Sequence, residues 1–173
     1  WRDLKLGVEY CSRVCCMYAI KQAMLISGAL PLAEITIYYM DIRTFGKGYE
    51  QFYKNAQAMG VEFIRGKVAA IREDEDKNPV VKVELTEEGR ITERTHDLVV
   101  LSLGMLPNTE YNQVLNLQLG SDKFVAVEAP NARPCETSRP GIFVTGTAMG
   151  PMDIVDSVVA ASAAASARSE EHT

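Results

Sequence analysis

The sequence has few of the features that mark secreted, membrane-spanning or nucleic-acid-binding proteins. It contains four cysteines in 173 residues, and three of them fall between residues 11 and 16, unlike the spaced cysteines of a secreted disulfide framework. No window reaches the roughly 18 uninterrupted apolar residues of a membrane span, and no signal peptide is visible. The net charge is −5 and no basic run stands out, which argues against a nucleic-acid partner. We therefore expect a cytoplasmic protein.

Apolar residues recur with helical and strand spacing and are separated by glycines and prolines, which predicts an α/β fold. Gly28 and Pro31 are expected to end a first helix, and Gly60 suits the C′ position of a second. The order of elements predicts a Rossmann-like three-layer sheet with a β-meander. The expected helices are 14–27, 49–60 and one after the turn at Gly150–Pro151; the expected strands are 34–40, one or two within 61–71, two within 80–97, "LVVLSL" (98–103) and "GIFVTG" (141–146).

Two segments look like parts of the two-dinucleotide-binding flavoproteins, the pyridine nucleotide–disulfide oxidoreductase superfamily. "DLVVLSLGMLPNTE" resembles the return from the nicotinamide-type domain to the FAD domain, and "RPGIFVTGTAMGPMDIVDS" resembles the late FAD motif. The resemblance implies that residues 1–104 are a partial nicotinamide-type domain. It implies that residues 105–173 are the C-terminal part of an FAD-binding domain.

Three further segments resemble a narrower group. "YCSRVCCMYAIKQA", "IYYMDIRTFGKGYEQFY" and "GPMDIVDSVVAASAAA" are similar to the A subunits of heterodisulfide reductase and of the quinone-interacting membrane-bound oxidoreductase. The resemblance implies an oxidoreductase subunit that binds FAD and iron–sulfur clusters and passes electrons between partner subunits, with a homodimer as an open alternative. The glycine fingerprint G-x-G-x-x-G is absent, so the chain resembles a C-terminal portion of such a protein.

The cysteine motif suits a metal cluster better than a disulfide. Cys11 and Cys15 are four apart and would share a face of a helix, whereas a disulfide between the adjacent Cys15 and Cys16 would be strained. Adjacent thiolates can ligate different irons of one 4Fe-4S cluster, which usually takes four cysteines. The resemblance implies a fourth ligand upstream of the chain; Cys135 is the alternative within it. Buried packing thiols and a redox-active dithiol are the competing interpretations of the motif.

The resemblance also indicates residues that face a flavin. Lys21 corresponds to a lysine near the isoalloxazine ring, where a cation would stabilise the reduced flavin; an ordinary solvated lysine is the alternative. Asp153 would accept a hydrogen bond from a flavin hydroxyl or else cap the last helix. Backbone N–H groups at the start of that helix would bind the flavin. The cofactor-binding candidates are Lys21, Gly146, Thr147, Gly150, Met152, Asp153 and Ile154.

A nicotinamide nucleotide is disfavoured because residues 12–14, Ser-Arg-Val, stand where such a site needs a glycine-rich turn. Arg43 and Lys47 could read a 2′-phosphate, but capping of their loop or contact with a partner protein is the favoured interpretation. Neither His96 nor His172 belongs to a recognisable catalytic group. The competing functions are therefore an electron-transfer subunit, an NAD(P)H-dependent flavin disulfide reductase that uses cysteine thiols, and a non-catalytic docking fragment.

Overall fold

The computed structural model describes residues 8–170, and the chain divides into two compact units. The sheet unit comprises Cys15–Leu103, and the α4 unit comprises residues 8–14 together with residues 104–170. The cysteine motif is divided between them, because Cys11 belongs to the α4 unit while Cys15 and Cys16 belong to the sheet unit. The domain identities expected for 1–104 and 105–173 stay predictions, and their outermost residues, like His172, lie outside the described range.

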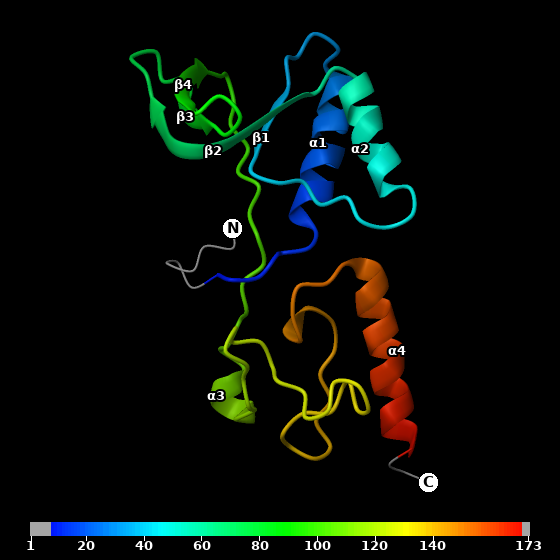
Figure 1. Ribbon diagram of the computed structural model, residues 1–173. Coiled ribbons are helices and arrows are strands. Elements are labelled where there is room, and N and C mark those ends of the chain that lie inside the picture. Colours follow the sequence, from blue (N-terminus) through cyan, green and yellow to red (C-terminus); the bar gives the residue numbers. More distant parts are fainter. Residues whose placement is uncertain (1–7, 171–173) are drawn as a thin grey trace. The chain divides into compact units, whose positions relative to one another are not determined.

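The sheet unit contains two helices and one four-stranded sheet (Figure 1). The sheet order is β1-β2-β3-β4, with β1 and β2 parallel and the other pairs antiparallel. The α/β fold and the meander expected from the sequence are confirmed. The elements are α1 Cys15–Ala29, β1 Thr36–Tyr39, α2 Tyr49–Ala58, β2 Glu62–Glu73, β3 Pro79–Leu85 and β4 Arg90–Thr95.

Local sequence signals explain where both helices end. α1 continues through Gly28 to Ala29, slightly beyond the expected end, and Pro31 follows, which lacks an N–H group to extend the helix. α2 is followed by Met59 in a helical conformation and then by Gly60 with φ 91°. A left-handed conformation at C′ favours glycine, as expected for Gly60.

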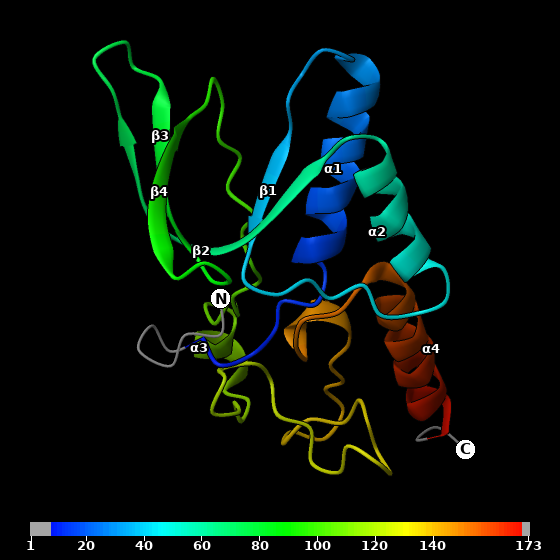
Figure 2. The same cartoon turned by 45° about the horizontal axis from the view of Figure 1, so that its top comes forward.

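The two helices and the end of the meander lie on opposite faces of β1. Ile20 and Ala23 of α1 and Ala56 of α2 form a buried cluster against which Ile37 of β1 packs, and α1 and α2 lie side by side in both views (Figure 1, Figure 2). Successive residues of a strand point to opposite faces. Tyr38 accordingly contacts His96, which follows β4, on the other face. This arrangement gives the three layers expected from the sequence.

The expected apolar strand at 98–103 is wrong for this structure, because that segment has no regular secondary structure. Leu98, Leu101 and Leu103 are 73%, 64% and 63% exposed. A strand requires a neighbour that pairs with its N–H and C=O groups, and no described strand pairs with this segment. Hydrophobicity alone therefore did not make it a strand.

The α4 unit is built mainly from loops around a small core. Leu117, Val125 and Val144 form a buried hydrophobic cluster in it, and a long C-terminal helix follows them. The strand expected at 141–146 is reduced to one isolated bridge between Glu136 and Phe143. The elements are α3 Asn112–Leu115, the 3-10 helix η2 Gly146–Ala148 and α4 Ile154–Glu170, the last as expected. No described helix combines the length and apolar character needed to cross a membrane.

Candidate functional site

Two residues that flank Cys11 fix its segment to the α4 unit. The Tyr10 hydroxyl donates to the carbonyl oxygen of Met105 at 3.0 Å, and the Tyr10 ring packs edge-on against Phe124. Ser12 is only 1% exposed, and its Oγ accepts the Met105 N–H at 2.9 Å. Tyr10 and Ser12 thus bind both polar backbone groups of Met105, and Cys11 lies between them.

Arg13 makes a tight turn immediately before α1. Its φ is 65°, and the Val14 N–H donates to the Ser12 carbonyl oxygen at 2.8 Å. The Arg13 N–H points back to Cys11 Sγ at 3.3 Å. The expectation that Cys11 and Cys15 share a helical face is therefore wrong, because a left-handed residue between them interrupts the helix and α1 begins only at Cys15.

Cys15 and Cys16 occupy the first turn of α1, and both are half-buried, like Cys11. No disulfide joins any of the four cysteines, all of which are described. Between residues 8 and 170 no group of three or more His, Cys, Asp or Glu side chains is arranged to hold a metal ion. The structure therefore presents three motif cysteines outside any disulfide, and Cys11 Sγ accepts a backbone N–H bond.

The Arg13 side chain reaches the start of α4. Its Nε lies 3.7 Å from Asp153 Oδ2, and its Nη2 pairs closely with Asp156 Oδ2. Asp153 also caps α4, since its Oδ1 accepts the Asp156 N–H at 2.9 Å. Of the two roles expected for Asp153, the structure shows the capping of α4. The ion pairs were missed from the sequence, where Arg13 and Asp153 are separated by 140 positions and no local signal connects them.

The remaining flavin candidates of the α4 unit lie in the segment that leads into α4 and at its first residue. Gly146 has φ 62° and opens η2, followed by the exposed Thr147. Gly150 has φ 156°, and a Cβ there would meet no atom within 4 Å. Met152 is half-buried and Ile154 is 83% exposed. This backbone is open beside Gly150, which leaves room for a bound group to approach it closely.

The other sequence candidates lie in the sheet unit. Lys21 is exposed on α1. Arg43 Nε lies 3.4 Å from Asp41 Oδ2, which is the loop contact favoured for it above, and Lys47 is exposed. The structure therefore groups Arg13 with Asp153 in one unit and places Lys21 in the other.

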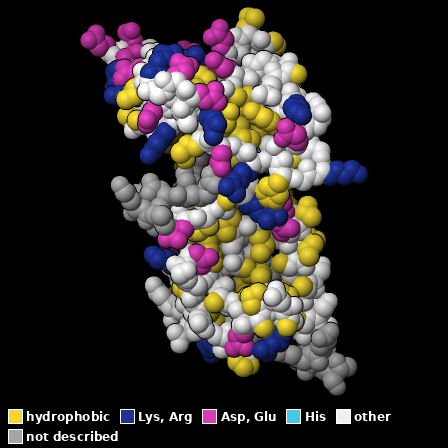
Figure 3. Space-filling model, in the orientation of Figure 1, with side chains coloured by type: hydrophobic (Ala, Val, Ile, Leu, Met, Phe, Trp, Pro, Cys, Tyr) yellow, Lys and Arg dark blue, Asp and Glu magenta, His cyan; other side chains and the backbone are white. Residues whose placement is uncertain are grey.

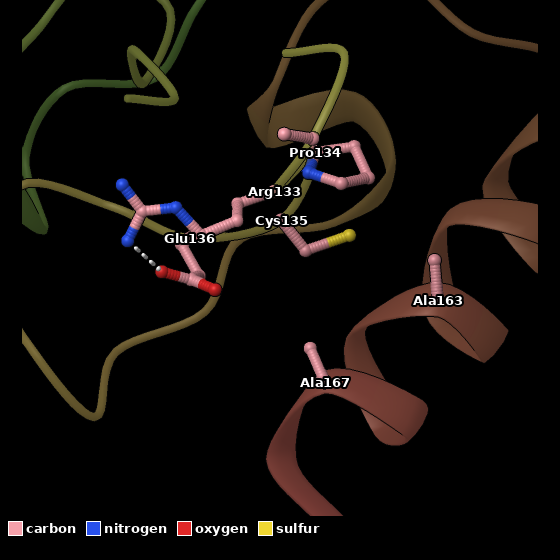
Figure 4. A pocket seen from close by; sticks show the side chains of 7 residues that line it. Arg133, Pro134, Cys135, Glu136, Ala163 and Ala167 are labelled. Atoms are coloured by element: carbon pink, nitrogen blue, oxygen red, sulfur yellow. Dashed lines mark hydrogen bonds and ion pairs between the residues drawn. The ribbon is translucent and has the colours of Figure 1, made fainter. Parts of the chain in front are cut away.

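Cys135 lies in a different setting from the motif cysteines. It is 2% exposed and lines a cavity of about 280 Å³. Its thiol points toward α4, where Ala163 and Ala167 face it (Figure 4). Burial raises the pKa of the Cys135 thiol, so this sulfur stays protonated at neutral pH. The structure thus shows Cys135 as a buried thiol that faces α4.

A polar cluster that the sequence did not reveal joins β1, β2 and the end of the meander. The Tyr38 hydroxyl lies 2.9 Å from His96 Nε2, and Arg94 pairs with Glu62. Burial raises the pKa of Tyr38, while the hydrogen bond from Arg94 lowers the pKa of Glu62. His96 thus has a partner that only the pairing of distant strands brings within reach.

The family model described as pyridine nucleotide-disulphide oxidoreductase matches residues 10–165. The chain belongs to this family. Its fold is similar to that of thioredoxin reductase from Lactococcus lactis, with a TM-score of 0.66 and 19% identity over 88% of this chain and 49% of that one. That likeness concerns the α/β fold alone.

Curated relatives are much more similar in sequence. The iron–sulfur A subunit of the CoB–CoM heterodisulfide reductase of Methanocaldococcus jannaschii is 50% identical over 96% of this chain. The A subunit of the H(2):CoB-CoM heterodisulfide,ferredoxin reductase of Methanothermobacter thermautotrophicus is 45% identical over 95% of it. The expected resemblance to the A subunits of heterodisulfide reductases is confirmed. The chain spans 26% of the length of each of these relatives.

Proposed function

We propose that this chain is part of an electron-transfer subunit, containing FAD and iron–sulfur, of a heterodisulfide reductase-like complex. The observation that carries the proposal is the cysteine triplet of the motif, in a chain that is 45–50% identical to curated A subunits, one of them named for its iron–sulfur content. Electrons would pass to other subunits of the complex. A cytoplasmic location and a homodimer belong to the same proposal.

In this proposal Cys11, Cys15 and Cys16 are ligands of a 4Fe-4S cluster whose fourth ligand lies upstream. The three cysteines are half-buried and no disulfide joins them, and Cys11 Sγ accepts an N–H bond of the kind that tunes iron–sulfur sites.

The flavin would lie against the backbone that leads into α4. Gly146, Thr147, Gly150, Met152 and Ile154 would contact it, with Asp153 holding the first turn of the helix in place. Lys21 would stabilise negative charge on the reduced ring. When bound, FAD supplies the exchange between two-electron and one-electron chemistry.

An NAD(P)H-dependent disulfide reductase is the alternative that the family description favours. Two features oppose it. The Arg13 and Val14 N–H groups, which a glycine turn would offer to a pyrophosphate, already bond to Cys11 Sγ and the Ser12 carbonyl oxygen. Residue 13 also carries a long side chain where a glycine-rich turn would have none.

Anaerobic reconstitution with iron and sulfide tests the proposal in a longer form of the protein that includes upstream sequence. We expect about four irons per chain and broad visible absorption. C11S, C15S and C16S should each lose most of the iron, whereas C135S should retain it because that thiol is buried against α4. Equal loss in C135S, or rapid NAD(P)H oxidation without bound iron, would contradict the proposal.

A further inference from the structure

Arg13 connects the cysteine motif to the start of α4 through two kinds of contact. Its backbone N–H donates to Cys11 Sγ at 3.3 Å, and its guanidinium pairs with Asp153 and Asp156. All four residues belong to the α4 unit. A single residue therefore contacts both a motif sulfur and the carboxylates at the N-terminal turn of α4.

The backbone of Arg13 indicates that these contacts hold a conformation the chain would otherwise avoid. A φ of 65° is unfavourable for a long side chain, and such residues persist where surrounding interactions determine them. Tyr10 and Ser12 fix the segment on one side of Cys11 through Met105. On the other side, the ion pairs of Arg13 with Asp153 and Asp156 connect it to the start of α4.

We propose that Arg13 is a positioning residue for Cys11, which it fixes relative to the N-terminal turn of α4 through its pairing with Asp153 and Asp156. This inference deepens the proposed function and rests on it, because α4 is the helix assigned to the flavin and Cys11 is assigned to the cluster. Arg13 touches neither group itself. It sets where the Cys11 sulfur lies and which charges surround it.

The charges of Arg13, Asp153 and Asp156 distinguish a positioning role from simple packing, because they predict the direction in which the midpoint potential shifts. The guanidinium pairs with two carboxylates, while the backbone N–H of the same residue contacts Cys11 Sγ, so its removal leaves those carboxylates without their cation. Extra negative charge beside an iron–sulfur cluster favours its oxidised form. Removal of a carboxylate has the opposite effect. The midpoint potential should therefore fall in R13N and rise in D156N, whereas simple loosening of the loop would shift both variants in the same direction.

The first measurement is the alkaline plateau of the rate at which iodoacetamide alkylates Cys11 in the complete protein before iron and flavin are added, read by peptide mass spectrometry. At the plateau the thiol is fully ionised, so the rate reports its exposure and not the effect of nearby charges on thiolate formation. R13N removes the cation but keeps a residue that accepts left-handed φ. We expect alkylation of Cys11 to become about threefold to fivefold faster, because a partly exposed ion pair is a weak interaction. R13K should lie between R13N and wild type, and Cys16 should react at an unchanged rate.

A charge exchange gives the decisive control. R13D places a third carboxylate beside those of Asp153 and Asp156 while keeping a residue tolerant of left-handed φ. It should therefore expose Cys11 at least as much as R13N does. Adding D156R restores an opposite pair, and the double variant should return toward the wild-type rate. Similar alkylation in wild type and R13N, or no rescue in the double variant, would overturn the positioning role.

The second measurement is the midpoint potential of the reconstituted protein, followed by electron paramagnetic resonance. Opposite shifts in R13N and D156N support the inference, and shifts of the same sign contradict it. Failure of wild-type protein to assemble a cluster would instead contradict the proposed function. The alkylation result would still decide whether Arg13 positions Cys11, since it requires neither iron nor flavin.

Discussion

Glu62 and Arg94 are 32 positions apart, yet they form a charge pair within the sheet unit. Arg94 Nη1 lies 2.6 Å from Glu62 Oε2, and Thr36 Oγ1 donates to the same oxygen at 2.9 Å. The hydrogen bond from Arg94 lowers the pKa of Glu62 in the folded chain. The ionised carboxylate therefore stabilises the fold above the usual glutamate range, and this contribution is lost as pH falls through the lowered folded pKa.

We expect E62Q to lower the free energy of unfolding at pH 7 by less than about 1 kcal/mol, since both partners are nearly half exposed and screened by water. The difference between E62Q and wild type should shrink in acid, because wild-type Glu62 is then protonated. Urea denaturation at pH 7 and at an acidic pH measures this difference in the free energy of unfolding. E88Q is the matched control, since Glu88 pairs with Arg90 inside one hairpin turn. A difference that persists in acid would count against the charge pair.

At the scale of elements, β2 shows how one glycine lets two strands approach. A Cβ at Gly66 would lie 2.6 Å from the Glu84 carbonyl oxygen and 2.8 Å from Val83 Cγ2. The register between β2 and β3 shifts between Val68 and Ala70, a bulge that bends the strand. Gly66 is therefore required by close approach, because its φ is not left-handed.

We expect G66A to destabilise the sheet unit by about 1–3 kcal/mol, because the backbone of β3 would have to move. G28A is the control, because it should change the stability in the opposite direction. Gly28 lies within α1 and a Cβ there meets no atom within 4 Å, so the change should stabilise the protein by about 0.5–1 kcal/mol through helix propensity. Thermal unfolding followed by circular dichroism compares the two variants. Equal stability of G66A and wild type would show that β3 adjusts freely.

Elements with local signals were predicted well and elements without them were not. The capping glycine at Gly60 and the apolar spacing of α2 act within a few residues, so they are readable in the sequence. The segments at 98–103 and 141–146 are as apolar as real strands. Whether such a segment becomes a strand depends on a partner strand, which local composition does not specify.

At the scale of the whole molecule, α4 leaves an apolar face exposed. Ile154, Val155, Val158 and Val159 share one side of the helix and are 60–83% exposed. Hydrophobic side chains are visible at the surface of the α4 unit (Figure 3, lower half). Exposed apolar patches of this kind promote association.

Replacing Val155 and Val159 with glutamine should reduce binding of an apolar fluorescent dye by the 173-residue chain and slow its aggregation, because two exposed valines at 66% and 63% are removed. The helical circular dichroism signal should not fall, since glutamine is a good helix former. A161Q is the matched control, because Ala161 is exposed on the same helix but carries little apolar surface. Equal dye binding in all three proteins would place the apolar surface elsewhere.

By itself the sequence determined the local elements and the chemical character of the site: three helices, the meander, the cysteine spacing and the glycines before α4. These depend on neighbours along the chain, where propensity and capping act. Only the tertiary structure decided that Cys11 stands outside α1, that Arg13 meets Asp153 and Asp156, and that His96 meets Tyr38. Ion pairs and strand pairing join residues far apart in sequence, so their partners are defined only once the chain has folded.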